Sequence, residues 1–326
     1  MHARLLTTLF AVAIAAFPLE AQNLESFRFQ VDNDWFDFSI KSVDRPDDNY
    51  THGQLIRAVL NSAPKWVLLG RPSCATARRT TAGPLPVCVQ TYINVNQQMF
   101  TPTRDSPQPV DGERPYAGVL FAEYGRQSVS PRVLKSLEGI VGVTGEPSGA
   151  EWAQKLFHRL ADLRKPQGWA HQVGAEPVLG LMYGHQYILG RPPTSKRSFG
   201  NIAAKASALA TTIQTSATVG AEIHAGFNVP HPWMPADIIQ RRRLSGYIIL
   251  GGNESFVARN VLLTGNTDET QGLITKKDLI PETIIGFALG SGGVFVEYRA
   301  VGQGREYETG PAWHRWGAIS IVVGTP

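Results

Sequence analysis

Short segments in which apolar and polar residues alternate recur along most of the chain. In the first, at residues 26–33, Phe27, Phe29 and Val31 occupy every second position. A period of two is the pattern of a β-strand with one apolar and one polar face. Similar segments predict further strands at residues 53–60, 89–100, 117–129, 134–144, 172–189, 199–211, 214–227, 245–257, 283–289, 294–301 and 313–323.

The number of these segments and their aromatic residues favour a membrane barrel. Twelve is an even number, as a closed single-chain bacterial barrel requires. A soluble β-sandwich would alternate as well, but aromatic residues near segment ends fit the girdles where a barrel wall meets the two membrane surfaces. The candidates are Phe100, Tyr116, Tyr124, Tyr183, Tyr187, Trp313 and Trp316. We therefore predict an all-β fold, an antiparallel 12-stranded transmembrane β-barrel.

One connection between predicted strands has a helical pattern. An apolar stripe predicts a short helix over residues 149–163, and its members are Trp152, Leu156, Leu160 and Leu163. Gln154 and His158 lie four residues apart, so they share a different face. With both chain termini in the periplasm, connections after odd-numbered strands are extracellular, which places this helix in an extracellular loop. Its apolar side must rest on the barrel wall or on lipid.

The N-terminus has the layout of a secretory signal. One positive charge in residues 1–4 precedes an apolar run over residues 5–17, and a plausible cleavage site follows at residues 19–21. The run is shorter than the ~20 residues that a membrane-spanning helix needs. We therefore predict a signal peptide over residues 1–21 and a barrel domain over residues 22–326, located in the outer membrane.

Composition adds few constraints. The formal net charge of +4 is small for 326 residues and does not indicate a nucleic-acid partner. Cys74 and Cys88 are expected to pair across a short loop in an oxidising compartment, the alternative being two unpaired thiols. They lie in the connection at residues 61–88. That connection and the one at residues 228–244 are long for inner turns, and the sequence offers no reason for either.

Oxygen-bearing residues gather where the first predicted strand ends and the second begins. Residues 32–34 read Asp-Asn-Asp, and residues 47–53 read Asp-Asp-Asn-Tyr-Thr-His-Gly. Pairing of the two strands would bring them together, and Ca²⁺ takes six to eight oxygen ligands. A nearby histidine such as His158 could deprotonate a water while the ion polarises a carbonyl. Asp and Asn at strand ends are also common turn formers, and a helical histidine is often a surface residue, so both alternatives stay open.

Five motifs follow one another between about residues 26 and 190. They are Asp32-Asn33-Asp34, Tyr50-Thr51-His52-Gly53, Arg114-Pro115-Tyr116-Ala117-Gly118, a Gly-rich segment at residues 139–145 followed by Gln154 and His158, and Pro166-Gln167-Gly168-Trp169 followed by Gln172 and Glu176-Pro177. In this order they resemble the outer-membrane lipid A 3′-O-deacylases. Each motif is weak alone, and together they are specific.

The resemblance implies a twelve-stranded barrel and a Ca²⁺-dependent esterase that removes the acyloxyacyl chain at the 3′ position of lipid A. It assigns the general base to His158 and calcium ligation to Asp34, with Thr51 nearby. It also places Asn33 and Gln154 in the site, Asn33 as a candidate oxyanion donor. The expected partners are lipid A or lipopolysaccharide and the outer membrane, and the expected state is a monomer.

The chain departs from the family pattern in three ways. His52 replaces the usual Asn, the last residues 323–326 lack a terminal aromatic, and the connection with the two cysteines is unfamiliar.

Two other functions stay open: a non-catalytic porin or lipid-binding barrel, and a phospholipase A-type barrel, whose His and Ser pair has no matching motif here. His52 or His171, in neighbouring outer loops, could be the base in place of His158.

Overall fold

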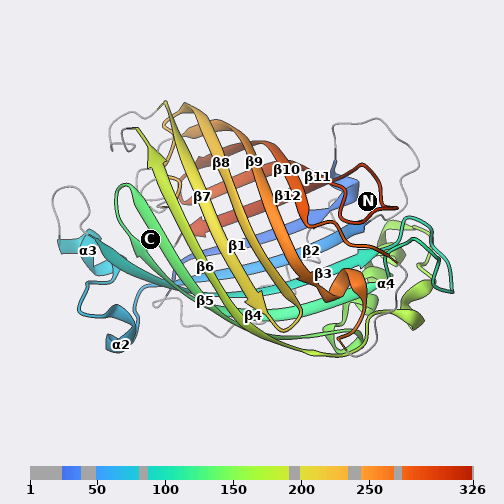
Figure 1. Cartoon of the computed structure of the whole chain (residues 1–326). Coiled ribbons are helices and arrows are strands. Elements are labelled where there is room, and N and C mark those ends of the chain that lie inside the picture. Colours follow the sequence, from blue (N-terminus) through green and yellow to red (C-terminus); the bar gives the residue numbers. More distant parts are fainter. Residues whose placement is uncertain are drawn as a thin grey trace.

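The computed structural model describes residues 24–37, 49–80, 87–190, 199–233, 244–267 and 274–324. Within these residues twelve strands form one closed barrel (Figure 1), and each strand runs antiparallel to both of its neighbours. The strands are β1 (Leu24–Asn33), β2 (Asn49–Leu60), β3 (Cys88–Thr101), β4 (Ala117–Val129), β5 (Val133–Thr144), β6 (Pro177–Leu189), β7 (Gly200–Thr211), β8 (Gln214–Phe227), β9 (Ser245–Asn260), β10 (Leu279–Ser291), β11 (Val294–Gly304) and β12 (Trp313–Gly324). The predicted signal peptide lies outside the described residues.

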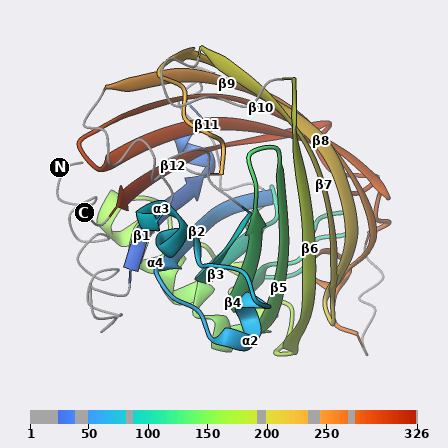
Figure 2. The same cartoon turned by 90° about the vertical axis from the view of Figure 1, so that its left-hand side faces the viewer.

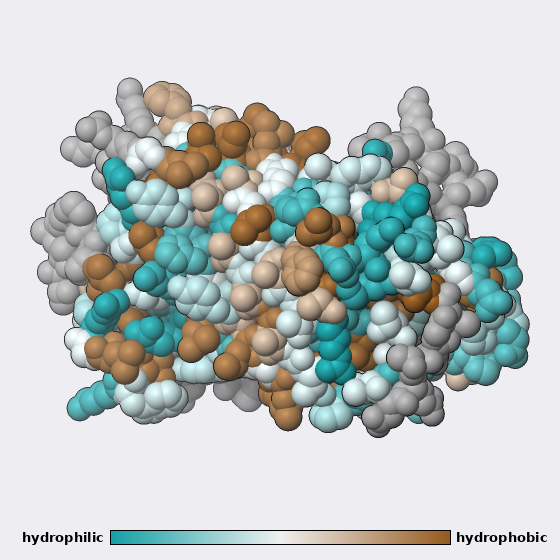
Figure 3. All heavy atoms as spheres, in the orientation of Figure 1, coloured by the Kyte–Doolittle hydropathy of each residue, from teal (hydrophilic) through white to brown (hydrophobic). Residues whose placement is uncertain are grey.

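The period of two sorts side chains between the lumen and the outer surface. Arg28 of β1 is an inward residue and lines the lumen. Val141 of β5 and Val219 of β8 are outward residues, and both side chains are largely exposed. Apolar residues accordingly spread over the strands that face the viewer in Figure 3. Most predicted boundaries are met within a few residues. The sixth strand begins at Pro177 rather than at residue 172, because the chain first forms the 3-10 helix η4 (Gly168–His171).

The seven aromatic residues expected in the girdles fall into two groups. Four of them, Tyr124, Tyr183, Tyr187 and Trp313, are well exposed. Three assignments were wrong, because packing within the protein takes these rings out of the surface. Phe100 lies under the Arg114 guanidinium at 4.4 Å, Tyr116 packs on Trp169 at 5.1 Å and Trp316 packs on Tyr50 at 5.0 Å. In the described part of the chain, no helix has the length and apolar character needed to cross a membrane.

The two ends of the barrel are built differently. We call the end that carries the connections after odd-numbered strands the outer end, and the opposite one the inner end. Side chains join the outer-end connections to one another: Arg114 Nη1 donates to Glu306 at 2.9 Å, and Asn266 Nδ2 donates to Glu176 at 2.9 Å. These bonds link connections that are far apart in sequence, so the outer loops form a shared layer above the wall.

The inner end is covered by the two connections whose length the sequence did not explain. The first holds α2 (Lys65–Leu68) and α3 (Cys74–Thr80) and is closed by a disulfide between Cys74 and Cys88, which confirms the predicted pairing. Helix α3 packs with Trp233 of the second connection against inward residues such as Leu134. Figure 2 shows α3 lying within the ring of strands at this end. The described parts of both connections therefore cover the inner mouth of the lumen.

Removing the disulfide should loosen α3 without opening the barrel. The bond joins residues 14 apart in sequence, and a link closing such a loop stabilises by about 3 kcal/mol. In Cys88→Ser we expect protease to cut faster between residues 61 and 88, while the heat-dependent gel shift of a folded barrel is retained. Cys74→Ser and wild type treated with a reductant should show the same faster cleavage as Cys88→Ser. Unchanged cleavage in all three would contradict this role.

Candidate active site

Asn33, at the outer end of β1, turns the chain over the outer surface of the barrel. Arg28 faces the lumen, so alternation puts Asn33 on the outer face. Its Oδ1 accepts from Trp35 N at 2.9 Å and caps the 3-10 helix η2 (Asp34–Phe36), in which Asp34 is buried. Its Nδ2 lies 3.2 Å from both Thr51 O and His52 Nδ1. Both contacts are made by the amide nitrogen, and the oxyanion role expected for Asn33 stays a prediction.

An irregularity in β2 places Thr51 beside this turn. The register between β2 and β3 shifts between Tyr50 and His52, and such a bulge redirects the side chain at that point. Thr51 is buried, with its hydroxyl 2.6 Å from that of Thr101. Tyr50 instead points into the lumen, where its hydroxyl donates to Asp32 at 2.8 Å. The expected oxygen cluster is therefore divided: Asp32 faces the lumen, whereas Thr51 lies against Thr101 outside it.

The helix α4 (Ala150–Ala161) confirms the predicted short helix and packs on the outer face of β3 and β4. It comes so close that a Cβ at Gly118 would lie 2.4 Å from both Ala150 Cβ and Ser148 Oγ. At the other end of α4, the Phe157 ring lies 6.0 Å from the ring of His52. The helix thus runs along the outer wall from β4 to the ends of β1 and β2, where Asn33, Asp34 and Thr51 lie.

Helix α4 turns Gln154 and His158, and not the stripe with Trp152 and Leu160, toward the wall. Gln154 and His158 are both buried. Gln154 Oε1 accepts from Trp169 Nε1 at 2.6 Å, and the buried Trp169 packs in turn on Tyr116. Gln154 is therefore held by the segment that follows α4, which fixes how the helix is rotated on the barrel.

The ring of His158 is oriented by a backbone carbonyl. Asp162 ends α4 in the left-handed conformation, with φ of 57°, so the chain reverses. The carbonyl oxygen of Arg164 then meets His158 Nδ1. Because a carbonyl oxygen only accepts, Nδ1 carries the hydrogen, and in the neutral ring the lone pair is on Nε2. A histidine held in this way is prepared to accept a proton at Nε2.

The two alternative bases are placed differently. His52 contacts Asn33 through Nδ1 and Gln54 through Nε2, which lie 3.2 and 3.1 Å away, so both ring nitrogens meet amide side chains. His171 ends η4 and is exposed. Of the three, His158 is the one whose ring is fixed by a carbonyl acceptor, and this observation favours it as the base.

Comparison with known proteins decides the family. A family model described as "Outer membrane protein LpxR" matches residues 5–325. The chain belongs to the LpxR family. Among solved structures, LpxR from Salmonella typhimurium matches with a TM-score of 0.71 and 14% identity over 92% of this chain and 100% of that one. The β domain of the Bordetella autotransporter BrkA matches with a TM-score of 0.46 and 8% identity over 93% and 100%. A search of curated proteins finds no match.

Membership of the LpxR family makes this an outer membrane protein, and the likeness to the Salmonella structure confirms the predicted barrel. The structure also gives a physical role to two residues of the sequence motifs, Arg114 and Glu176. Arg114 is buried, pairs with Glu306 and lies over Phe100. Glu176 accepts from Asn266 and Thr267. Burial opposes ionisation of Glu176, but these hydrogen bonds hold its pKa below the usual value. Both motif residues therefore anchor outer loops.

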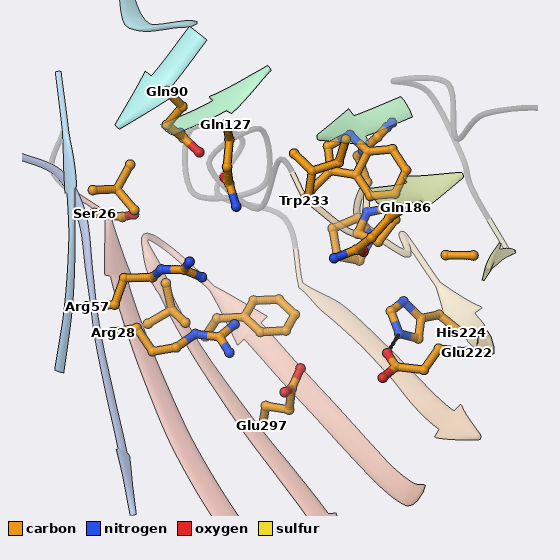
Figure 4. Close-up of a pocket in the computed structure, with 18 of the residues that line it drawn as sticks. Ser26, Arg28, Arg57, Gln90, Gln127, Gln186, Glu222, His224, Trp233 and Glu297 are labelled. Carbon is orange, nitrogen blue, oxygen red and sulfur yellow. Dashed lines mark hydrogen bonds and ion pairs between the residues drawn. The ribbon is translucent and has the colours of Figure 1, made fainter. Parts of the chain in front are cut away.

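The lumen of this LpxR-family barrel contains a charged cluster that the sequence reasoning missed. Arg299 donates to Glu297 at 2.7 Å and to Glu222 at 2.9 Å, and His224 Nε2 lies 3.3 Å from Glu222. They line a cavity of about 290 Å³ near the inner end, into which Arg28 also points (Figure 4). The sequence did contain a signal for this cluster, because Glu222 and His224 on β8, and Glu297 and Arg299 on β11, stand at every second position of their strands. The ion pair between Arg299 and Glu222 joins β11 to β8 within the lumen.

The described residues hold no group of three or more His, Cys, Asp and Glu side chains suited to a metal ion. The expected ligands offer the Asp34 carboxylate and the Thr51 hydroxyl, and residues 38–48, which include Asp47 and Asp48 of the predicted cluster, lie outside the described part of the chain. Asp34 and Thr51 are both buried hard oxygen donors, the type that Ca²⁺ prefers. The donor chemistry therefore fits the expected ion.

The close contact at Gly118 predicts how α4 can be displaced. Gly118→Val puts side-chain atoms where Ala150 and Ser148 lie, so α4 should lift and become sensitive to protease. Gly139→Val on β5 is the matched control, because a Cβ there meets nothing within 4 Å. Both variants should keep the heat-dependent gel shift of a barrel. Equal protease resistance of α4 in the two variants would contradict the packing.

Proposed function

We propose that this protein is a Ca²⁺-dependent esterase that removes the 3′-linked acyloxyacyl chain of lipid A. The observation that carries the proposal is the location of the candidate residues. Asn33, Asp34, Thr51 and the polar face of α4 lie on the outer surface of the wall at the outer end, not in the lumen. A substrate embedded in the outer leaflet could reach this surface from the side. A soluble substrate passing through a pore would meet the lumen instead.

In this proposal His158 is the general base. Its Nε2 takes a proton from water as the water attacks the ester carbonyl, while the bond from Nδ1 to the Arg164 carbonyl holds the ring and stabilises the imidazolium that forms. Gln154, fixed by Trp169, sets the rotation of the helix that carries this base. Asn33 is assigned a positioning role, because its amide joins the Thr51 carbonyl to the cap of η2.

Asp34 and Thr51 would hold the calcium ion. When bound, the ion supplies Lewis-acid polarisation of the ester carbonyl, which compensates the charge that develops on oxygen. A non-catalytic barrel would have no need for a histidine whose ring is oriented by a backbone carbonyl in this way.

Mass spectrometry of lipid A tests the proposal directly. Cells that express the protein should contain lipid A lighter by one acyloxyacyl group than cells without it, and the lost group should map to the 3′ position. Phospholipids from the same cells serve as the second measurement. Release of fatty acids from phospholipids with intact lipid A would instead support the phospholipase reading, and no change in either lipid would favour a non-catalytic barrel.

A further inference from the structure

Helix α4 carries an apolar stripe that the barrel leaves uncovered. Ala150, Gln154 and His158 are 1%, 3% and 6% exposed, whereas Trp152 and Leu160 are 68% and 40% exposed. Two positions along a helix correspond to about 200° around its axis, so the two sets lie on opposite sides. A helix on a water-exposed surface ordinarily turns its apolar stripe toward the protein. Here the stripe faces away from it.

The barrel wall cannot cover this stripe. The wall side of α4 is set by Gly118, whose Cα sits against Ala150 and Ser148, so the opposite side of the helix points outward. Leu163, just after the helix, is also 41% exposed. Leaving side chains of this size in water costs about 1.5–3 kcal/mol each relative to burial. A medium less polar than water would remove that cost.

Basic side chains border the stripe. Arg159 is exposed on the same side of α4, and Lys155 beside it is half-buried and pairs with Glu151. Arg164 and Lys165 are exposed directly after the helix. Trp and Leu on one face with Lys and Arg at its border is the composition of a helix that lies in a membrane interface, because long basic side chains reach the anionic head groups from there. The pattern thus points to an anionic lipid leaflet rather than to water.

We propose that the exposed stripe of α4 is embedded in the outer leaflet of the membrane. Trp152 and Leu160 lie among the upper parts of the acyl chains, and Lys155 and Arg159 lie at the depth of the anionic head groups. The stripe continues the lipid-facing surface of the wall on which α4 rests, so one apolar medium covers both. The extracellular loop that carries α4 is then an interfacial element, and its polar face is enclosed between wall and leaflet. This does not depend on any catalytic role of His158.

Fluorescence quenching by brominated lipid tests the embedding. The full-length mature protein is refolded into vesicles of phosphatidylglycerol and phosphatidylcholine brominated on the acyl chains, either near the head group or near the chain end. In wild type we expect part of the tryptophan emission to be quenched, more strongly by the shallow bromines. Trp152→Phe should lose a large share of this quenchable emission.

Trp316→Phe is the matched control, because Trp316 lies near the same outer end but is packed on Tyr50 and His314 inside the barrel. This variant should keep the quenching of wild type. Each variant is first shown to fold by its heat-dependent gel shift, and Trp152→Tyr replaces Trp152→Phe if the latter fails. If bromolipid quenches wild type and the Trp152 variant to the same extent, the proposal is overturned. Iodide added to the water shows whether Trp152 faces water in that case, and the proposal fails whether or not iodide quenches it.

Discussion

Replacing His158 with Asn is expected to lower the turnover of lipid A deacylation by about 10²–10⁴-fold, the usual contribution of a general base. The variant keeps a polar side chain of similar size next to the Arg164 carbonyl, so the barrel and α4 should fold normally. Release of the 3′ chain from lipid A in mixed micelles, measured by mass spectrometry, gives the rates. The wild-type rate should fall as the pH drops, because the imidazolium has no lone pair to accept a proton.

His171→Asn is the matched control for this prediction, since His171 is an exposed histidine of the same outer loop. Its turnover should equal that of wild type. His52→Asn restores the residue usual in the resembled family and should cost less than the loss at His158. If the His158 variant keeps near-normal turnover while either of the other two loses it, the base has been assigned to the wrong histidine.

Asp34→Asn should reduce activity to the level of wild type treated with excess chelator, because it removes the one carboxylate assigned to calcium. Asp32→Asn is the control. Asp32 precedes it by two residues but faces the lumen, where it accepts from Gln30 and Tyr50. That variant should respond to added Ca²⁺ like wild type. Binding of Ca²⁺, followed as a rise in thermal stability on titration, should be lost in the Asp34 variant alone.

Activity that persists in excess chelator would rule out a catalytic metal and leave His158 without this partner. Loss of activity in the Asp34 variant with unchanged Ca²⁺ binding would place the ion elsewhere and give Asp34 another role. The two measurements therefore separate a failure of the calcium assignment from a failure of the site as a whole.

The reversed orientation of α4 shows where sequence patterns stop being informative. The spacing of Trp152, Leu156 and Leu160 identified the helix and its two faces correctly. Which face meets the barrel depends on the surroundings, because an apolar stripe is stabilised equally by a protein core and by lipid. The decisive contact, Gly118 against Ala150, lies between two chain segments whose approach no local pattern reveals.

The sequence by itself determined the strands of the wall, their number and the disulfide partners, and it supplied the residues of the candidate site. These features are local: a period of two needs only neighbouring residues, and each motif is a short run. Only the tertiary structure decided that Asp32 faces the lumen while Thr51 lies against Thr101 outside it, that the Asn33 amide is engaged by Thr51 and His52, and that α3 and Trp233 cover the inner mouth. Pairs such as Arg299 and Glu222, 77 residues apart, meet because the barrel closes on itself, and that closure is a property of the whole chain.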